Sequence, residues 1–298
     1  YSIKIFEAQP RAGGMMRYGI PEYRLPYSAL DADIDYILSL GVEIQYNTRV
    51  GQDVALEKLH EEYDSILVGT GLHAGRSTRI PGTDHKHVYQ AVDLLREFSK
   101  GNEIPVSEKI VVIGGGNVAM DITRTLSRLQ NKKYGRVQIT TTSLETEEIM
   151  PADQEEIDEA REEKVNLKPG WGPQKIEIDN DQIKGLHVQR CLSVFDDNGR
   201  FNPKFDESQT DFFEGDMVVE AIGQGMDITY ISKSMRDGLD FTERGRLMVN
   251  NYFQSKQEWL FMGGDIIQGP DVIHGIANGH KAARGIDKYL RGELKYNE

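Results

Sequence analysis

Short apolar runs alternate with longer amphipathic stretches along most of this chain. A short run that is apolar throughout is typical of a strand buried on both faces, whereas apolar residues recurring every three to four positions predict a helix. The expected strands are Ile3–Phe6, Ser65–Val68, Lys109–Ile113, Arg136–Thr140 and Asp216–Ala221. The expected helices are Asp31–Leu40, Asn117–Gln130, Ala152–Glu163 and Ile273–Leu290. This alternation predicts an α/β fold whose parallel sheets are covered on both faces.

The pattern changes between about Gln182 and Phe213. Ile183–Phe195 has the pattern of one extended segment, and the Asp197-Asn198-Gly199 sequence that follows is a strong turn signal. We therefore expect an antiparallel hairpin or small meander here, inserted in the α/β frame.

The segment Lys109–Asp121, with the sequence KIVVIGGGNVAMD, is the sharpest chemical signal in the chain. Gly114 permits a tight turn after the strand, Gly116 lets the backbone approach a pyrophosphate, and Ala119 allows the helix to pack closely on the strand. The start of the helix adds free N–H groups and the positive end of its dipole. The segment predicts a dinucleotide-binding turn, and a purely structural glycine turn is the alternative.

A carboxylate follows the next expected strand, at Glu145. A carboxylate there would accept hydrogen bonds from the adenosine ribose hydroxyls and repel a 2′-phosphate, whereas a site for NADP would need arginines. Glu145 lies further beyond Gly114 than is usual, which the long helix and the Lys132–Gly135 loop explain. The hypothesis is a preference for NAD(H), and an ordinary solvated acid is the alternative.

Composition narrows the classes of function. The 298 residues carry 35 Lys and Arg against 48 Asp and Glu, a formal net charge of −13, which disfavours nucleic-acid and anionic-membrane partners. The single cysteine, Cys191, cannot form a CxxC redox pair or an iron–sulfur site within this chain. No apolar stretch is long enough for a transmembrane helix. Composition therefore predicts a soluble, cytoplasmic protein.

Other candidate sites carry less weight. The acidic run Asp153–Glu163 is interpreted as a solvated helix face, with a metal or partner site as the alternative. The seven histidines show no spacing typical of metal ligands, and no GxSxG nucleophile motif is present. We expect no metal site and nominate no catalytic proton-transfer residue.

Five segments together carry a family resemblance. They include the FEAQPRAGGMMRYGIPEYRLP string at Phe6–Pro26 and the VGTG string at Val68–Gly71. The others are the glycine turn, the AIGQ string at Ala221–Gln224 and the segment Gly263–Ala283. Nearly the whole chain resembles the small (β) subunit of glutamate synthase. That family includes the flavin module of dihydropyrimidine dehydrogenase and NADH-dependent ferredoxin:NADP oxidoreductases.

The resemblance implies two nested Rossmann-like domains, each doubly wound and three-layered. An FAD-type domain would be discontinuous, built from residues 1–105 and 224–298. An inserted NAD(P)-binding domain would span 106–223 and contain the antiparallel meander.

The resemblance also implies residues that contact each cofactor. Glu7 would bind the FAD ribose and Arg24 would lie near the flavin or its phosphates, while ordinary surface and salt-bridge roles are the alternatives. The remaining FAD positions are Gly13, Gly14, Met15, Val50, Thr70, Gly264, Asp265, Val272 and Ile273. For Met15 the alternative is core packing, and for Asp265 it is helix capping. The dinucleotide positions are Gly114, Gly115, Gly116, Asn117, Val118 and Glu145, with Ala221, Ile222 and Gly223 on the nicotinamide side.

The chain departs from the family pattern in two places. NADPH-using relatives carry paired arginines where Leu144 and Glu145 stand, which supports the NADH hypothesis. The family's first strand, its GxGxxG turn for the FAD pyrophosphate and its cysteine-rich iron–sulfur region have no counterpart in these 298 residues, which open on what should be the second strand of the FAD-type domain. The resemblance therefore implies an N-terminally truncated member, either a fragment or an incomplete record of a longer polypeptide. We therefore expect an FAD-type sheet without its central strand and weak flavin binding by these 298 residues.

The resemblance implies an NAD(P)H-oxidising, electron-input subunit of a glutamate synthase-like oxidoreductase. Hydride would pass from NAD(P)H to FAD, and electrons would continue to iron–sulfur clusters or to a large catalytic partner subunit. The alternatives are a related flavin module that feeds ferredoxin or a dihydropyrimidine site, and a non-catalytic nucleotide-binding fragment of a larger complex.

Overall fold

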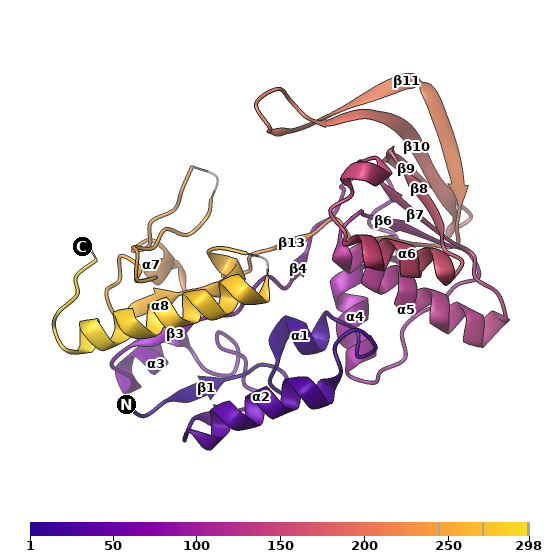
Figure 1. Ribbon diagram of the computed structural model, residues 1–298. Helices are drawn as coiled ribbons and strands as arrows, with labels where there is room; N and C mark the ends of the chain where they lie inside the picture. The colour runs from indigo at the N-terminus through magenta and orange to yellow at the C-terminus, as the bar shows by residue number, and fades with distance from the viewer. Residues whose placement is uncertain (244, 270, 297–298) are drawn as a thin grey trace. The chain divides into compact units, whose positions relative to one another are not determined.

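The computed structural model describes residues 1–243, 245–269 and 271–296 (Figure 1). The chain forms two compact units. The first unit combines Tyr1–Met15, Ser28–His73 and Met226–Glu298, and the second combines Met16–Tyr27 with Ala74–Gly225. The second unit contains all of the segment 106–223 that the sequence assigns to the inserted domain. It also takes in Met16–Tyr27 and residues 74–105.

A parallel sheet of five strands forms the centre of the second unit. Its strand order is β5 (Val88–Gln90), β12 (Met217–Glu220), β6 (Ile110–Ile113), β7 (Ile139–Ser143) and β8 (Asn166–Pro169). Every residue of β6 and of β12 is buried, as expected for strands covered on both faces. β7 begins later than the expected Arg136–Thr140, because the preceding helix continues to Tyr134 and is capped by Gly135 in the left-handed conformation.

Different layers cover the two faces of this sheet. One face packs against α4 (Ala91–Ser99), α5 (Asn117–Tyr134) and α6 (Gln154–Glu162), with Ile110 and Val112 in the shared core. The other face, with Val111 and Ile113, packs against a three-stranded antiparallel sheet. The second unit therefore has three layers, which are helices, a parallel sheet and an antiparallel sheet.

The antiparallel sheet contains the hairpin that the sequence predicts. Its strands are β9 (Trp171–Asp179), β10 (Gln182–Phe195) and β11 (Phe201–Glu214), in the order β11-β10-β9. Gly199, with φ of 69°, lies in the turn between β10 and β11. The hairpin is confirmed, whereas β9 extends the sheet beyond the range that the sequence indicated.

The first unit is built around two separate pairs of parallel strands. β1 (Lys4–Phe6) pairs with β2 (Glu43–Gln45), and β3 (Ile66–Val68) pairs with β14 (Leu260–Met262). Its helices are α2 (Tyr27–Ser39), α3 (Leu56–Glu62), α7 (Lys233–Arg236) and α8 (Val272–Leu290), with the short helix η2 (Gly264–Ile266). The short helix α1 (Gly14–Tyr18) begins in the first unit and ends in the second. Within the described residues no strand joins the two pairs. The second unit also has two pairs of parallel strands, β7–β8 and β5–β12, but there β6 lies between the pairs and joins them into one sheet.

Two short strands, β4 (Ala74–Gly75) and β13 (Gln224–Gly225), lie where the chain enters and leaves the large segment of the second unit. They pair antiparallel, with Gly75 opposite Gln224. Among the described residues, no helix combines the length and the apolarity needed to cross a bilayer.

Candidate dinucleotide site

The glycine turn follows β6, as the sequence predicts. Gly114 has φ of 151°, and its N–H donates to the carbonyl of Thr142 at 2.7 Å. A Cβ on Gly114 would overlap the carbonyl oxygen of Ala221, and it would lie 3.1 Å from the Cβ of Ala119. Glycine is therefore required at this position, both for the backbone conformation and for the close approach of two segments.

The other residues of the turn leave room above the start of α5. Gly116 is the N-cap of α5 and has extended backbone, and a Cβ there would have no atom within 4 Å. Asn117 and Val118 form the first turn of the helix, where backbone N–H groups have no partner inside the helix. The side chain of Asn117 instead exchanges two hydrogen bonds with Asp153, the N-cap of α6. Open space over unpaired N–H groups fits a pyrophosphate.

Glu145 lies beside this turn. Its carboxylate oxygen Oε2 would be 3.2 Å from a Cβ on Gly115, and the Cβ of Ser143 would be 2.8 Å away. The backbone carbonyl of Glu145 accepts hydrogen bonds from the Ser143 hydroxyl and from the Gly170 N–H. The end of β7 thus holds a carboxylate next to the glycine turn, where an adenosine ribose would be expected.

Ala221, Ile222 and Gly223 reach the same edge of the sheet from β12. Ala221 N–H donates to the carbonyl of Ile113 at 2.8 Å, and Gly223 has φ of 98°. The structure therefore brings together the nine predicted dinucleotide residues around the carboxyl ends of β6, β7 and β12. Their role in binding stays a prediction.

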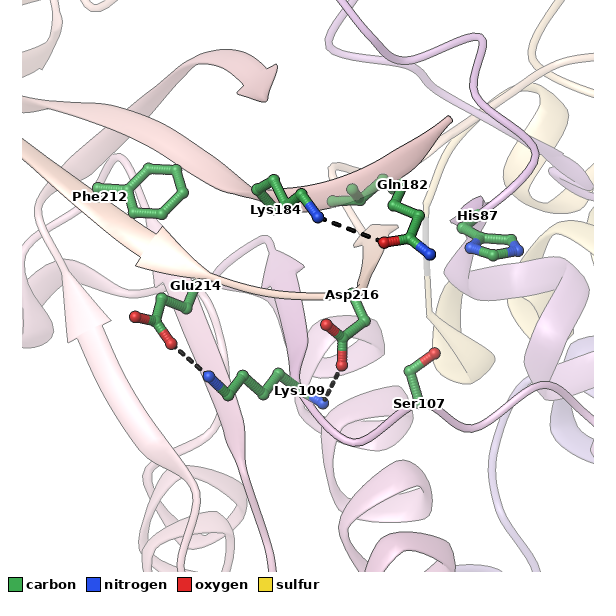
Figure 2. A pocket seen from close by; sticks show the side chains of 9 residues that line it. His87, Ser107, Lys109, Gln182, Lys184, Phe212, Glu214 and Asp216 are labelled. Atoms are coloured by element: carbon green, nitrogen blue, oxygen red, sulfur yellow. Dashed lines mark hydrogen bonds and ion pairs between the residues drawn. The ribbon is translucent and has the colours of Figure 1, made fainter. Parts of the chain in front are cut away.

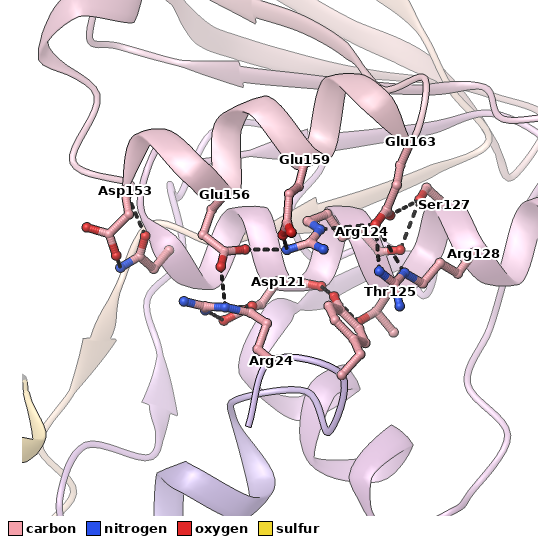
Figure 3. Close-up of polar contacts among 12 residues, drawn as sticks. Arg24, Asp121, Arg124, Thr125, Ser127, Arg128, Asp153, Glu156, Glu159 and Glu163 are labelled. Carbon is pink, nitrogen blue, oxygen red and sulfur yellow. Dashed lines mark hydrogen bonds and ion pairs between the residues drawn. The ribbon is translucent and has the colours of Figure 1, made fainter. Parts of the chain in front are cut away.

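Arg24 lies in the second unit, within a buried polar network (Figure 3). Its guanidinium donates to both carboxylate oxygens of Asp121 on α5, at 2.8 and 2.9 Å, and pairs with Glu156 on α6. Arg124 pairs with Glu156 and Glu159. Arg24 has a salt-bridge role here, one of the two possibilities in the sequence, and a flavin contact stays untested.

The same network revises the interpretation of the acidic run. Glu156 is only 6% exposed and Glu163 pairs with Arg124 and Arg128, so these two acids do not belong to a solvated face. The other acids are more accessible, and Asp153, Glu155, Asp158 and Glu162 are exposed, as the sequence predicts. Burial also raises the pKa of Asp121 to about 6, although the positive charge of Arg24 acts to lower this pKa. Sequence reasoning missed this network, although a carboxylate at Asp121 amid buried helix positions was a usable signal.

The predicted FAD residues of the first unit fall into two groups. The first group lies at the end of the β1–β2 pair. There Glu7 accepts the Gln9 N–H at 2.7 Å, and burial raises the pKa of the Glu7 carboxyl. Gly13 and Gly14 both have positive φ, Met15 is half-buried in α1, and Val50 forms a bridge to Val54.

The second group lies at the end of the β3–β14 pair. Thr70 hydrogen-bonds the Tyr230 hydroxyl at 3.1 Å, and Gly264 N–H donates to Asn278 at 3.2 Å. Burial raises the pKa of Asp265, whereas Ile273 at the start of α8 is 79% exposed. Val272, the first residue of α8, is also exposed. Among the described residues no strand lies between the two pairs, and no phosphate-binding turn joins the two groups.

A separate hollow of about 530 Å³ lies at the ends of the parallel strands opposite to the glycine turn (Figure 2). Its lining includes His87, Lys109 and Asp216, which directly precede β5, β6 and β12. Lys109 there pairs with Glu214, and Lys184 with Gln182. The hollow is therefore at the amino ends of the strands, away from the glycine turn. In the described residues no group of His, Cys, Asp and Glu is arranged to hold a metal.

The α/β fold and the glycine turn after β6 are typical of dinucleotide-binding proteins. A family model described as pyridine nucleotide-disulphide oxidoreductase matches residues 7–284, and the chain belongs to this family. Its members are NAD(P)H-dependent flavin oxidoreductases, so this chain is of the oxidoreductase class.

Curated relatives match almost the whole chain. The chain is 35% identical to the NADP(+)-dependent formate dehydrogenase subunit beta of Moorella thermoacetica, over 98% of this chain and 41% of that protein. It is 31% identical to the NAD-dependent dihydropyrimidine dehydrogenase subunit PreT of Escherichia coli O157:H7, over 98% and 63%. It is 30% identical to the glutamate synthase [NADPH] small chain of Halomonas elongata, over 96% and 62%. The chain thus spans less than two thirds of each of these relatives.

Solved structures show the same fold. FprA of Mycobacterium tuberculosis in complex with NADPH superposes with a TM-score of 0.79 at 16% identity, covering 99% of this chain and 80% of that one. Thioredoxin reductase of T. acidophilum gives a TM-score of 0.66 at 15% identity, covering 97% and 90%. These neighbours confirm the predicted α/β fold with Rossmann-like domains.

Proposed function

We propose that this chain is the NADH-oxidising, electron-input part of a multi-subunit oxidoreductase of the glutamate synthase type. The observation that carries the proposal is the complete glycine turn with the Glu145 carboxylate beside it. Several relatives are named as subunits or small chains, which supports a partner subunit. The identity of that partner, whether an iron–sulfur-containing region or a large catalytic subunit, belongs to the proposal.

The second unit would hold the dinucleotide. The N–H groups at the start of α5 would bind the pyrophosphate, and Ala221–Gly223 would border the nicotinamide. Bound FAD would supply the acceptor for hydride, a transfer that depends on close alignment of two rings rather than on a proton-transfer residue. The first unit would contribute the FAD residues of both groups, Glu7 with Gly13–Met15 and Thr70 with Gly264–Asp265.

The Glu145 carboxylate supports selection of NADH over NADPH. A carboxylate beside the ribose favours free hydroxyl groups and repels a phosphate dianion. The relatives include proteins named for either nucleotide, so the preference must be tested on this chain.

Glu145→Gln is expected to reduce or abolish the preference for NADH. Loss of charge-assisted hydrogen bonds should weaken NADH binding by about tenfold, and loss of repulsion should strengthen NADPH binding. Fluorescence titration of both nucleotides measures the two dissociation constants. Glu148→Gln, the same charge change at an exposed neighbour, is the control and should alter neither. Tighter binding of NADPH than NADH by the unaltered chain would refute the preference.

Flavin content is a further expected result. The 298-residue chain purified alone should carry little or no FAD, because no phosphate-binding turn in the described part of the chain joins its two groups of FAD residues. The visible absorbance of the purified protein, before and after denaturation, measures bound flavin. A yellow protein with stoichiometric FAD would contradict this expectation.

The related alternative is a flavin module that feeds ferredoxin or a dihydropyrimidine site, and its supporting observation is the similarity to the dihydropyrimidine dehydrogenase subunit. Identification of the subunit that co-purifies with the full-length protein separates the two. A non-catalytic nucleotide-binding role would be favoured if the complex showed no NADH-dependent dye reduction with FAD added.

A further inference from the structure

A buried carboxylate lies at the end of β12, one residue before the predicted nicotinamide segment. Glu220 is 2% exposed, and its neighbour Ala221 packs against the glycine turn. Burying an ionised carboxylate is costly unless hydrogen bonds compensate for the lost water. The hydrogen-bond partners of Glu220 therefore indicate its role.

Four donors converge on this carboxylate. Oxygen Oε1 accepts the backbone N–H and the hydroxyl of Thr78, both at 2.6 Å, and the hydroxyl of Ser77 at 3.2 Å. Oxygen Oε2 accepts the side-chain amide of Gln90 at 2.7 Å. These donors are uncharged and come from two places, the segment after β4 and the end of β5. Glu220 thus holds three parts of the second unit together.

The segment after β4 in turn holds the nicotinamide side of the predicted site. Arg76 N–H donates to the carbonyl of Gly223 at 3.0 Å, and Gly75 pairs with Gln224. Gly75 also lies so close to Gln90 that a Cβ would overlap its side chain. The Ala221–Gly223 turn is therefore fixed at its start by β12 and at its end by Arg76, next to the residues that Glu220 binds.

We propose that Glu220 is a positioning residue for the nicotinamide end of the dinucleotide site. It fixes Ser77 and Thr78, and through Arg76 it fixes the backbone of Ala221–Gly223. This inference rests on the proposed function, because it assumes that the second unit binds NADH. It assigns to Glu220 no contact with the dinucleotide.

Two variants of Glu220 separate the effect of its hydrogen bonds from the effect of its negative charge. Glu220→Gln keeps an oxygen for the Thr78 and Ser77 donors, and Gln90 can rotate its amide to accept from the new NH2 group. Glu220→Leu has similar size but no acceptor. The probes are NADH and ADP-ribose, since ADP-ribose shares the pyrophosphate and ribose but lacks the nicotinamide.

The 298-residue chain is titrated with both probes by calorimetry. Glu220→Leu should lose about tenfold in NADH affinity and change ADP-ribose affinity by less than about twofold. Glu220→Gln should stay within about twofold of the unaltered chain for both probes. The inference would be overturned if Glu220→Leu lost affinity for both probes or for neither. It would also be overturned if Glu220→Gln lost as much NADH affinity as Glu220→Leu.

Hydrogen exchange gives a readout independent of the nucleotide. In Glu220→Leu the amides of Arg76 and Thr78 should exchange faster, while the amides in the middle of α5 keep their protection. Thr78→Val, which removes one donor, replaces Glu220→Leu if that variant does not fold, and should show a smaller change of the same kind. Unchanged exchange at Arg76 would also overturn the inference. If the unaltered chain binds neither probe, the proposed function itself fails, and the inference fails with it.

Discussion

Gly114→Ala is expected to abolish measurable NADH binding and to destabilise the second unit. The new Cβ would overlap the carbonyl oxygen of Ala221, and Gly114 has φ of 151°, which side chains rarely adopt. Overpacking and backbone strain together should lower the free energy of unfolding by about 3 kcal/mol. Separation of β6 from β12 should weaken NADH binding by at least about 100-fold. Urea denaturation and NADH titration measure the two effects.

Gly116→Ala is the matched control for this change. Gly116 has extended backbone and open space around its Cβ position, so alanine there should leave the free energy of unfolding within about 0.5 kcal/mol. The added methyl group would nevertheless occupy the space where a pyrophosphate is expected, so NADH binding should still fall. Unchanged NADH binding in Gly116→Ala would contradict the placement of the pyrophosphate over this residue.

Arg24→Ala should destabilise the protein by about 3 kcal/mol at pH 8, because it leaves the carboxylates of Asp121 and Glu156 buried without this cation. This value is at the lower end for buried pairs, since the Arg24 side chain is 21% exposed. Arg136→Ala is the control, because Arg136 and its partner Glu108 are both more than half exposed and should contribute less than about 1 kcal/mol. Urea denaturation monitored by circular dichroism measures both.

The effect of Arg24→Ala should diminish as the pH falls. The pKa of Asp121 is already raised to about 6 by burial, above its ordinary value, and loss of Arg24 should raise it further. An acid whose folded-state pKa is raised favours the folded state at low pH and loses that contribution as the pH rises through the folded-state pKa. The variant should therefore differ less from the unaltered protein at pH 5 than at pH 8. Arg24→Ala combined with Asp121→Asn should recover part of the loss at pH 8, and an equal loss at both pH values would count against a buried charge.

The strand, the glycine turn and the helix of the proposed dinucleotide site could be predicted because their sequence signal is local. The strand, the glycine turn and α5 follow one another directly, so the apolar run and the spacing of Gly114, Gly116 and Ala119 define them. Glu145 follows β7 even though that strand starts three residues later than expected. β8 was missed because Asn166–Pro169 contains no apolar run.

The Arg24 network depends on contacts between residues far apart in sequence. Arg24 and Asp121 are 97 positions apart, and no periodicity or spacing links them. Met16–Tyr27, which carries Arg24, belongs to the second unit, although the residues on either side belong to the first. Glu220 was likewise missed, because its four donors come from segments that approach β12 only in the folded chain.

The pairing of β4 with β13 has a consequence for the order of folding. β3 and β14 form one ladder although Ser65 and Trp259, at its start, are 194 positions apart. Closing so long a loop in an unfolded chain carries an entropic cost that grows with its length. Once Ala74–Gly225 has folded, β4 and β13 hold its two ends together, and only residues 69–73 and 226–259 remain to be closed, far fewer than before. The ladder of the first unit should therefore form after the second unit, so a slow refolding phase would report on β3 and β14 rather than on β6.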